Sequence, residues 1–410
     1  MALTKFYCRV GLASGDDDGS SWDNAWASLA SMIAGIDAAL DASTSGVELQ
    51  IGIEGTNDAD NRYAIGGAAT VAASNPLKPL VIRSVTAENT YGIVYLSNVA
   101  TLTFTGRMIV VGIDLVTDYS GTTLAMKQGA IAYRCKASCV NGTGETLSIA
   151  DSPSGAYLCH IIGQGSGAGY TVYGLRGFCS KCFIETNNIG IVVAAGRGSF
   201  LINDNIIKPY DTSRTIGIRR DNGDAYSNIN IINNIIYDFD YGINLIEIFA
   251  DAADTVQPCF IHGNVIVNPS AGDYGIYGTP AMARNHGDFI CNNAIYCATG
   301  GNEISGDLAP DYPYLHNIIL TGDPFVNASA NDFRLSVDGD EFDTLIAQGF
   351  NIEMQFDIDN LLAGTVLLPK INYPTESNVL TGIEYANGQY TGTASGSGSG
   401  RLMRERRHNV

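Results

Sequence analysis

The feature that most constrains the fold of this chain is a short sequence phrase that returns between residues 187 and 320. Each copy is an asparagine followed by two apolar residues, and successive copies start 29, 30, 29 and 24 residues apart. A second phrase, glycine followed by isoleucine, keeps step with the first. A period of 20 to 50 residues indicates an array in which each unit closes its core only against its neighbours. The copies are Asn205-Ile206-Ile207, Asn234-Ile235-Ile236, Asn264-Val265-Ile266, Asn293-Ala294-Ile295 and Asn317-Ile318-Ile319, with Gly190-Ile191, Gly217-Ile218, Gly242-Ile243 and Gly275-Ile276.

The residue content of the repeat selects the kind of array. The units are rich in Ile, Val, Tyr and Phe separated by Asn, Asp and Gly, which favours short strands and tight turns over helices. A propeller blade needs about 40 to 50 residues, so this period is too short for one. The repeat therefore predicts a parallel β-solenoid.

The repeated asparagine suits the corner of such a coil. Asparagine tolerates the left-handed backbone of a sharp turn, and its amide can hydrogen-bond to the amide one rung away. We therefore expect the repeated asparagines to form a structural ladder, namely Asn205, Asn234, Asn264, Asn293 and Asn317.

Composition excludes several classes of protein. The chain has 410 residues, 45% of them apolar, and no apolar run approaches the roughly 18 residues of a membrane span. Met1 to Val10 contain Lys5 and Arg9 without an apolar core, so no signal peptide is predicted. The net charge is −19, and the first 400 residues hold 19 basic and 41 acidic residues, a balance of −22. An acidic body of this kind predicts neither nucleic acid nor membrane as a partner.

The nine cysteines are an odd number without repeated pairs. Cys135, Cys159 and Cys182 recur 24 and 23 residues apart, which predicts a stacked interior column of small apolar groups. Cys179 and Cys182 form a single CxxC without a second pair or a nearby histidine, which is a weak zinc signal. Four of the five histidines, His160, His262, His286 and His316, lie on separate coils or turns without metal spacing, so no metal or cofactor is predicted.

An amphipathic helix is predicted near the start of the chain. Apolar residues recur there at helical spacing, and Asp23 or Asn24 is placed to cap the first turn. The first rung of a solenoid exposes strand edges and a section of core, so a covering helix is expected there. The apolar positions are Trp26, Leu29, Ile33, Ile36 and Leu40.

The opening of the chain carries a family resemblance. The run from Asp18 to Trp26, which reads DGSSWDNAW, followed by that helix, resembles the start of right-handed parallel β-helix proteins of the pectate-lyase-like superfamily. The repeat is similar to the same family, and residues 322–326 and 331–335 resemble the phrase that closes its last coils. The resemblance implies an all-β, right-handed single-stranded parallel β-helix with an N-terminal capping helix and a C-terminal peptide tail. It implies little about activity, because the superfamily includes lyases, hydrolases, adhesins and structural proteins.

Between residues 47 and 186 the rungs are less regular. Strands are predicted between Gly, Asn, Asp and Pro turns. Two insertions are expected where the repeat lengthens, at Tyr210 to Asn228 and at Phe249 to Pro258. The predicted strands are Leu49–Ile53, Leu80–Ile82, Leu102–Phe104, Met108–Val111, Ala130–Tyr133 and Tyr157–Ile162.

The pattern changes after residue 338, and four segments result: a cap at 1–45, the β-helix at 46–340, a closing module at 341–393, and a Gly/Ser linker with a basic tail at 394–410. Part of the closing module, residues 374–393, resembles a short module near the ends of tailed-bacteriophage virion proteins. The tail suits docking into an acidic groove of a partner, with a solvated tail or a cloning remnant as alternatives. Its predicted docking residues are Arg401, Leu402, Met403, Arg404, Arg406 and Arg407.

The catalytic candidates in this sequence are charged residues on neighbouring coils. Glycoside hydrolysis needs two carboxylates about 5 to 10 Å apart, whereas lyases need a base beside acidic calcium ligands. Acidic residues are frequent throughout this chain, so solvated turns explain such groups better, and no catalytic residue is assigned. The groups considered are Asp211, Arg219, Arg220, Asp221 and Asp224 in one insertion, and Asp238, Asp240 and Glu247 one coil later.

Several tyrosines lie near predicted coil corners and are interpreted as corner packing, with stacking on sugar rings as the alternative. They are Tyr237, Tyr241, Tyr274 and Tyr277.

The first functional hypothesis is a bacteriophage virion structural protein, a decoration, fibre or accessory adhesin exposed to the extracellular medium. It would dock on other virion proteins through its basic tail, form a homo-oligomer and contact host surface polysaccharide. Tail spikes resemble a different order of segments, which is why a decoration protein is preferred. A tailspike-like polysaccharide depolymerase, either a glycoside hydrolase or a lyase, and a non-catalytic carbohydrate-binding adhesin are the alternatives.

Overall fold

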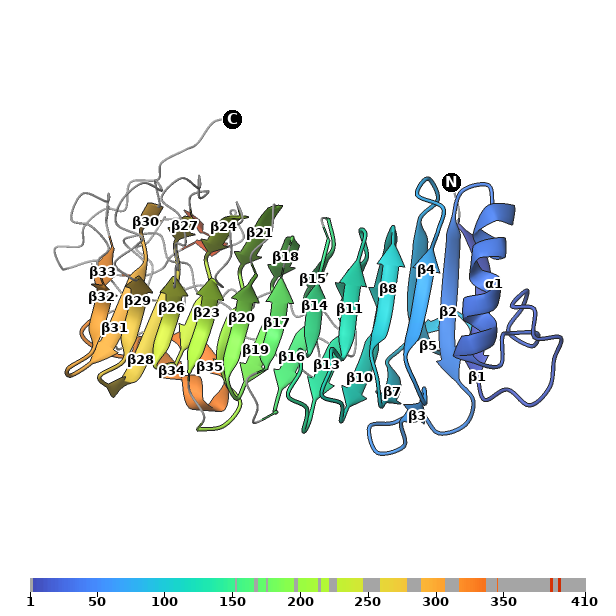
Figure 1. The fold of residues 1–410 in the computed structure, drawn as a ribbon, viewed down its shortest axis with the longest axis horizontal. Coiled ribbons are helices and arrows are strands. Elements are labelled where there is room, and N and C mark those ends of the chain that lie inside the picture. Colours follow the sequence, from blue (N-terminus) through green and yellow to red (C-terminus); the bar gives the residue numbers. More distant parts are fainter. Residues whose placement is uncertain are drawn as a thin grey trace.

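The protein is an elongated parallel β-helix with a helix against its N-terminal end (Figure 1). The computed structural model describes residues 3–336 except 152, 166–168, 175, 195–197, 213–214, 221–226, 246–258, 279–288 and 307–316, together with Leu345, 384–385 and 390–391. The predicted all-β parallel β-helix with an N-terminal capping helix is confirmed. The predicted tail, residues 394–410, lies outside the described residues.

Three long sheets form the walls, and from β2 to β32 the chain visits them in the order A, B, C on each turn. Sheet A joins β1 (Thr4–Val10), β2 (Val47–Ile53), β5 (Leu80–Ala87), β9 (Met108–Val111), β12 (Ile131–Tyr133), β15 (Gly155–Tyr157), β18 (Gly177–Ser180), β21 (Gly198–Asn203), β24 (Ser227–Ile232), β27 (Cys259–His262) and β30 (Phe289–Cys291). The short β6 (Thr90–Tyr91) pairs with β5 in antiparallel fashion.

Sheets B and C are built in the same way. Sheet B joins β3 (Tyr63–Ala64), β7 (Val94–Asn98), β10 (Ile113–Thr117), β13 (Lys136–Cys139), β16 (His160–Gly163), β19 (Phe183–Thr186), β22 (Ile206–Pro209), β25 (Ile235–Tyr237), β28 (Val265–Ala271), β31 (Ala294–Ala298) and β33 (Ile318–Ile319). Sheet C joins β4 (Ala69–Ala73), β8 (Leu102–Gly106), β11 (Leu124–Lys127), β14 (Leu147–Ile149), β17 (Tyr170–Gly174), β20 (Ile189–Val193), β23 (Ile216–Arg220), β26 (Tyr241–Leu245), β29 (Tyr274–Gly278) and β32 (Asn302–Gly306).

The N-terminal helix α1 (Leu29–Ala42) covers the first rung, but it starts later than the sequence predicted. Ser28, rather than Asp23 or Asn24, is its N-cap, and the Ser28 hydroxyl accepts a hydrogen bond from the Ser31 N–H at 3.0 Å. Trp26 lies before the helix because its backbone pairs with Tyr7 in β1. The Trp26 ring fills the space that Gly19 and Gly35 leave, since a Cβ on either glycine would lie within 2.8 Å of it.

One predicted strand and one predicted insertion between residues 157 and 228 need correction. The predicted strand Tyr157–Ile162 is two strands, β15 and β16, because Leu158 adopts a left-handed backbone conformation with φ of 54° and turns the chain. The predicted insertion Tyr210–Asn228 contains β23, which pairs in register with β20 and β26 and so belongs to sheet C. The second insertion, Phe249–Pro258, lies outside the described residues.

The corner between sheets A and B is the most uniform part of the fold. From β12 onwards each corner is two residues long, and the first of the two has a positive φ between 50° and 68°. The second residue points inward and is cysteine in the earlier rungs and asparagine in the later ones. The left-handed positions are Arg134, Leu158, Lys181, Asp204, Asn233, Gly263 and Asn292.

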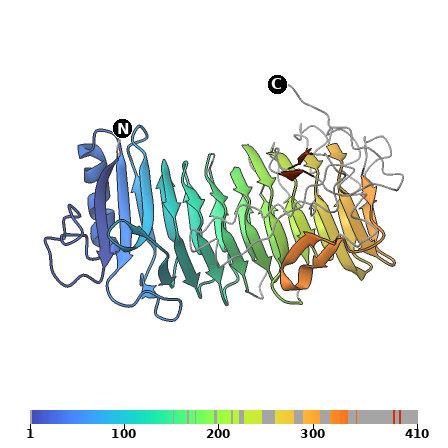
Figure 2. The ribbon, with the colours of Figure 1, turned by 180° about the vertical axis from the view of Figure 1, so that it is seen from behind.

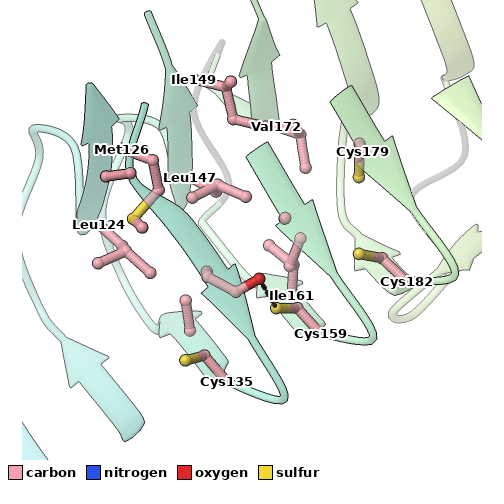
Figure 3. Packing of buried hydrophobic residues seen from close by; sticks show 14 of the residues in the cluster. Leu124, Met126, Cys135, Leu147, Ile149, Cys159, Ile161, Val172, Cys179 and Cys182 are labelled. Carbon is pink, nitrogen blue, oxygen red and sulfur yellow. Dashed lines mark hydrogen bonds between the residues drawn. The ribbon is translucent and has the colours of Figure 1, made fainter. Parts of the chain in front are cut away.

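The predicted thiol column and the predicted asparagine ladder therefore occupy one continuous corner. Cys135, Cys159 and Cys182 are buried and lie on successive rungs (Figure 3). The column continues directly into asparagine, because the Cys182 N–H donates to the Asn205 Oδ1 at 2.8 Å. The thiols of Cys135 and Cys159 lie 3.4 and 3.5 Å from carbonyl oxygens of the preceding rung, where the asparagine amides also donate.

Each asparagine of the later rungs is hydrogen-bonded to the next. The Oδ1 of Asn234 accepts from both the N–H and the Nδ2 of Asn205, at 3.0 and 2.9 Å, and the same pattern repeats up to Asn317. The Nδ2 of Asn234 also donates to the Ile202 carbonyl at 3.0 Å. These buried amides thus satisfy both their donors and their acceptors, which the low-dielectric interior requires.

The second repeated phrase packs against the first. A Cβ added to Gly190, Gly217, Gly242 or Gly275 would lie 2.5 to 2.7 Å from the Cγ2 of an isoleucine in sheet B. Those isoleucines are the last residues of the asparagine phrases: Ile207, Ile236, Ile266 and Ile295. The glycines are therefore required because sheets B and C approach closely at this edge.

A hairpin near the end of the described chain covers the outer face of sheet B (Figure 2). It consists of β34 (Phe325–Asn327), the 3-10 turn η2 (Ala328–Ala330) and β35 (Asp332–Leu335). Phe325 and Phe333 pack with Tyr237 and with the outward residues of sheet B in a second apolar cluster. A short pair, β36 (Glu384–Tyr385) and β37 (Tyr390–Thr391), lies within the predicted closing module.

Candidate functional site

The charged residues that the sequence offers as catalytic candidates lie on several elements of the described chain. Asp211 and Asp238 lie on turns that follow the neighbouring strands β22 and β25, and Asp240 immediately precedes β26. Arg219 and Arg220 are consecutive in β23 and so point to opposite faces of sheet C. Arg220 is 7% exposed and its Nη1 lies 3.1 Å from the Cys259 Sγ. The remaining candidates, Asp221, Asp224 and Glu247, lie outside the described residues.

The outer face of sheet C gathers tyrosines from the later rungs. Tyr241 and Tyr274 are directly paired in register, with ring centroids 5.0 Å apart and an interplanar angle of 4°. Tyr277 meets both rings edge-on at 5.3 Å. All three side chains are half-buried, so part of each ring is open to solvent. The cluster is a rigid aromatic surface, because each ring is held by the other two.

An arginine and a further tyrosine extend this surface towards the N-terminal end. The Arg219 guanidinium lies 5.1 Å from the ring centre of Tyr170, and its Nη2 donates to the Tyr170 hydroxyl at 3.0 Å. Arg219 is in β23 and Tyr170 in β17, so the side chain spans the intervening strand β20. Ile189 and Val192, the outward residues of β20, are accordingly buried.

A buried amide lies between the arginine and the tyrosine cluster. Asn244 aligns with Arg219 on one side and with Tyr277 on the other, and it is 3% exposed. Its Oδ1 has no hydrogen-bond partner among the described residues. A buried acceptor without a partner costs free energy, so this oxygen favours a ligand or water that donates to it.

The Tyr241 phenol on this face stays protonated over the physiological pH range. Burial, followed by the neighbouring Tyr274, Tyr277 and Asp240, raises the pKa of Tyr241 above its ordinary value. A neutral phenol can both donate and accept a hydrogen bond. Rings with polar edges, a guanidinium and an amide are together the groups that bind a polyhydroxylated ring.

A second charged cluster lies on the outer face of sheet B. The His160 Nε2 lies 2.9 Å from the Glu185 Oε2, and the Lys208 Nζ lies 3.6 Å from the Glu185 Oε1 and donates to the Asn331 Oδ1 at 2.7 Å. Burial, the largest influence, raises the pKa of Glu185, but the hydrogen bond from His160 and the charge of Lys208 together lower it below its ordinary value. Because Asn331 belongs to the docked hairpin, the cluster joins that hairpin to sheet B.

The remaining residues singled out from the sequence are the histidines and the predicted docking residues. His262 lies 3.0 Å from the Asn292 Nδ2, whereas His286 and His316 lie outside the described residues. Within the described part of the chain, no group of three or more metal-binding side chains comes together, and no helix is long and apolar enough to cross a membrane. The predicted docking residues, Arg401 to Arg407, are not among those described.

Sequence reasoning missed the partnership of Tyr170 and Arg219, which lie 49 residues apart. The sequence singles out Tyr241, Tyr274 and Tyr277, but it predicts corner packing for them. The strand register would have revealed the site. When the repeated glycines Gly190, Gly217, Gly242 and Gly275 are aligned in the sequence, the neighbouring residues that form the site align in columns on one face of sheet C.

Comparison with known proteins gives structural likeness alone. No family model matches the sequence, and no curated protein matches it. The structure is similar to a pectate lyase, Pel9A, with a TM-score of 0.47 and 10% identity over 83% of this chain and 91% of that one. It is also similar to an alginate lyase from Paenibacillus sp. str. FPU-7, with a TM-score of 0.36 and 12% identity over 77% of this chain and 98% of that one.

Proposed function

We propose that this chain is a rod-shaped surface protein of a bacteriophage particle that binds host-surface glycans through the outer face of sheet C. The observation that carries the binding function is the array of Tyr170, Arg219, Asn244 and the stacked pair Tyr241 and Tyr274. The array presents flat rings, hydrogen-bond donors and an unsatisfied buried acceptor along neighbouring rungs. A glycan chain laid along the rod offers the matching apolar ring faces and hydroxyl groups.

Binding of the purified chain to an array of bacterial surface glycans tests this function. Stacking of one ring is worth roughly 0.5 to 1.5 kcal/mol, so the double substitution Tyr241→Ala/Tyr274→Ala should weaken binding about tenfold. Tyr210→Ala is the matched control, since Tyr210 is 45% exposed on the turn after β22 and outside the array. Equal loss in the control, or no glycan bound by the native chain, would refute the binding function.

The placement on a particle is supported by the sequence of the C-terminal region. Residues 374–393 resemble a module of tailed-bacteriophage virion proteins, and residues 401–410 contain four arginines that suit an acidic groove. Deleting residues 394–410 should abolish incorporation into particles, while glycan binding by the isolated chain stays unchanged. A truncated chain that is incorporated at the normal level would contradict docking through the tail.

Polysaccharide cleavage is the second candidate, and one observation favours it. Asp240 directly precedes Tyr241 in the chain, and its charge is among the influences that raise the pKa of the Tyr241 phenol, so a carboxylate and a neutral phenol are neighbours at the start of β26. Such a pair can accept one proton and donate another. Release of oligosaccharides by the native chain, lost in Asp240→Asn and in Tyr241→Phe, would favour cleavage over binding alone.

A further inference from the structure

The charge of the chain is unevenly distributed along the rod. Residues 81–210 contain nine basic and seven acidic residues, whereas the first 400 residues as a whole have a balance of −22. The middle of the rod is therefore slightly basic within a strongly acidic molecule. A local excess of positive charge marks the region where an anionic ligand is least repelled.

Part of this basic region lies along the outer face of sheet A. Arg83, Val111, Tyr133, Tyr157 and Ser180 are aligned there by the register of five consecutive strands, β5 to β18. The rings of Tyr133 and Tyr157 are stacked, with centroids 5.9 Å apart and an interplanar angle of 6°. Two neighbouring rungs thus present parallel rings on the same face.

Three cations lie over tyrosine rings on this face. The Arg134 guanidinium is 5.1 Å from the ring centre of Tyr133, and the Lys181 Nζ is 5.9 Å from that of Tyr157. At the N-terminal end of the same column, the Arg83 guanidinium is 5.3 Å from the ring centre of Tyr91. We call these six residues the cation–tyrosine face: Arg83, Tyr91, Tyr133, Arg134, Tyr157 and Lys181.

A strip of apolar side chains runs beside the cation–tyrosine face on the same sheet. Ile109 is 41% exposed, and Ile131 on the next rung is half-buried. Gly155 follows, and the Phe178 ring lies over it, since a Cβ on Gly155 would be 2.6 Å from that ring. The missing side chain lets the Phe178 ring lie flat, so the strip has no projecting residue at this rung.

Carboxylates bound the cation–tyrosine face at both ends. Glu48 lies 3.9 Å from the Arg83 guanidinium at one end. Asp204 takes the corner position that follows Lys181 at the other end. Asp151 lies on the turn before β15 at the opposite edge of the sheet. A ligand of negative charge is therefore confined to the rungs from β5 to β18.

We propose that the cation–tyrosine face is a second binding surface, which takes an acidic polysaccharide chain lying along the rod. Its cations pair with carboxylate or sulfate groups, and its tyrosine rings and the apolar strip contact sugar rings. The surface is on a different sheet from the glycan-binding face of sheet C and does not depend on the function proposed for that face.

The spacing of the cations favours a sparsely charged polymer over nucleic acid. Arg134 and Lys181 are two rungs apart, which is about 10 Å at the usual strand separation. Duplex DNA carries one charge per about 1.7 Å, and the rest of this acidic molecule would repel such a density. Single-stranded nucleic acid and a second copy of the chain are the other possible occupants.

A suitable probe is carboxymethyl-dextran, which is an acidic polysaccharide. Unmodified dextran of the same length serves as the uncharged control polymer. The full chain should bind carboxymethyl-dextran with an affinity that falls as salt rises, and bind dextran at least tenfold more weakly. Arg134→Asn/Lys181→Asn should reduce carboxymethyl-dextran binding at least tenfold. Asparagine is chosen because both positions have a left-handed backbone, which it tolerates.

Controls keep the outcome clear. Lys5→Ala removes an exposed lysine of the first rung, outside the cation–tyrosine face, and should retain carboxymethyl-dextran binding. Unchanged thermal unfolding of Arg134→Asn/Lys181→Asn establishes that the variant is folded. Three outcomes would overturn the proposal. A single-stranded oligonucleotide binds more tightly than carboxymethyl-dextran, or self-association of the chain displaces carboxymethyl-dextran from the face. The third is equal binding of carboxymethyl-dextran by the native chain and by Arg134→Asn/Lys181→Asn.

Discussion

A Cβ atom on Gly217 would lie 2.6 Å from the Cγ2 of Ile236, which is closer than side-chain atoms pack. The two residues belong to different repeated phrases, one in sheet C and the other in sheet B, and their contact recurs on each of the regular rungs. The two phrases keep step in the sequence because their residues pack against each other.

Gly217→Ala should destabilise the protein by about 1 to 3 kcal/mol, because overpacking forces the sheets apart at this edge. Chemical denaturation measures the change in the free energy of unfolding. Gly67→Ala is the control, because a Cβ there would meet no atom within 4 Å. Similar unfolding curves for the two variants would show that the close approach of sheets B and C is not required.

Asn264→Ala should cost about 2 to 4 kcal/mol, since the substitution leaves several buried groups without partners, each worth about 1 to 3 kcal/mol. The N–H and Nδ2 of Asn234 would lose their common acceptor, and the Ile231 carbonyl would lose a donor. Thermal and chemical unfolding provide the measurement. Asn233→Ala, at the exposed first position of the preceding corner, should cost less, and the reverse order would contradict the ladder's role.

Leu158→Asn should stabilise the protein by up to about 1 kcal/mol, because leucine in the left-handed conformation is strained and asparagine is not. Leu158 has a φ of 54°, close to that of Asn233, which takes the same corner position three rungs later. The melting temperature reports the change. The reciprocal substitution Asn233→Leu should lower it, and a neutral result in both would show that this corner carries no strain.

Acid should weaken the contact between the hairpin and sheet B through Glu185. The pKa of Glu185 is lower in the folded protein than its ordinary value of 4.5, so its contribution to stability is present above that value. It is lost as the pH falls through the lower, folded-state pKa. Unfolding free energies measured between pH 7 and pH 3 should fall more steeply for the native chain than for Glu185→Gln, and parallel curves would exclude this carboxylate as a cause.

The thiols of the corner column should resist alkylation until the protein unfolds. The hydrogen bond that the Cys135 thiol donates to Cys159, together with burial, raises the pKa of Cys135 well above its ordinary value, and burial does the same for Cys159 and Cys182. Labelling at pH 8 followed by mass spectrometry should modify Cys291, which is only partly buried, before any of the three. Early labelling of Cys159 would indicate that the corner opens in the native state.

Periodicity made the later rungs predictable, and its weakening explains the errors elsewhere. The Asn and Gly-Ile phrases specify register directly, because residues one period apart stack on neighbouring rungs. The sequence predicts the thiol column and the asparagine ladder separately, because cysteine reads as a small apolar residue and asparagine as a polar turn residue, although both occupy the same corner. Leu158 hid the turn between β15 and β16, because leucine rarely adopts a left-handed backbone.

The candidate site was harder to predict than the fold, because its residues are brought together by stacking rather than by proximity in the sequence. Tyr170 and Arg219 meet across β20, and no local motif marks either residue. The position of the hairpin that carries Phe325 and Phe333 was also not predictable. This hairpin packs against the outer face of sheet B in an apolar cluster that includes Tyr237 and Ile206. These partners lie some 90 to 130 residues earlier in the chain.

The constant length of the A-to-B corner limits where this molecule can diversify. The connection at that edge is two residues long on every turn from β12 to β31. The connections at the other two edges differ in length: two residues join β17 to β18, and six join β22 to β23. Evolution or an engineer can therefore lengthen the variable edges without disturbing the interior. The A-to-B edge keeps the rungs in register, and loops at the other two edges can change to bind new ligands.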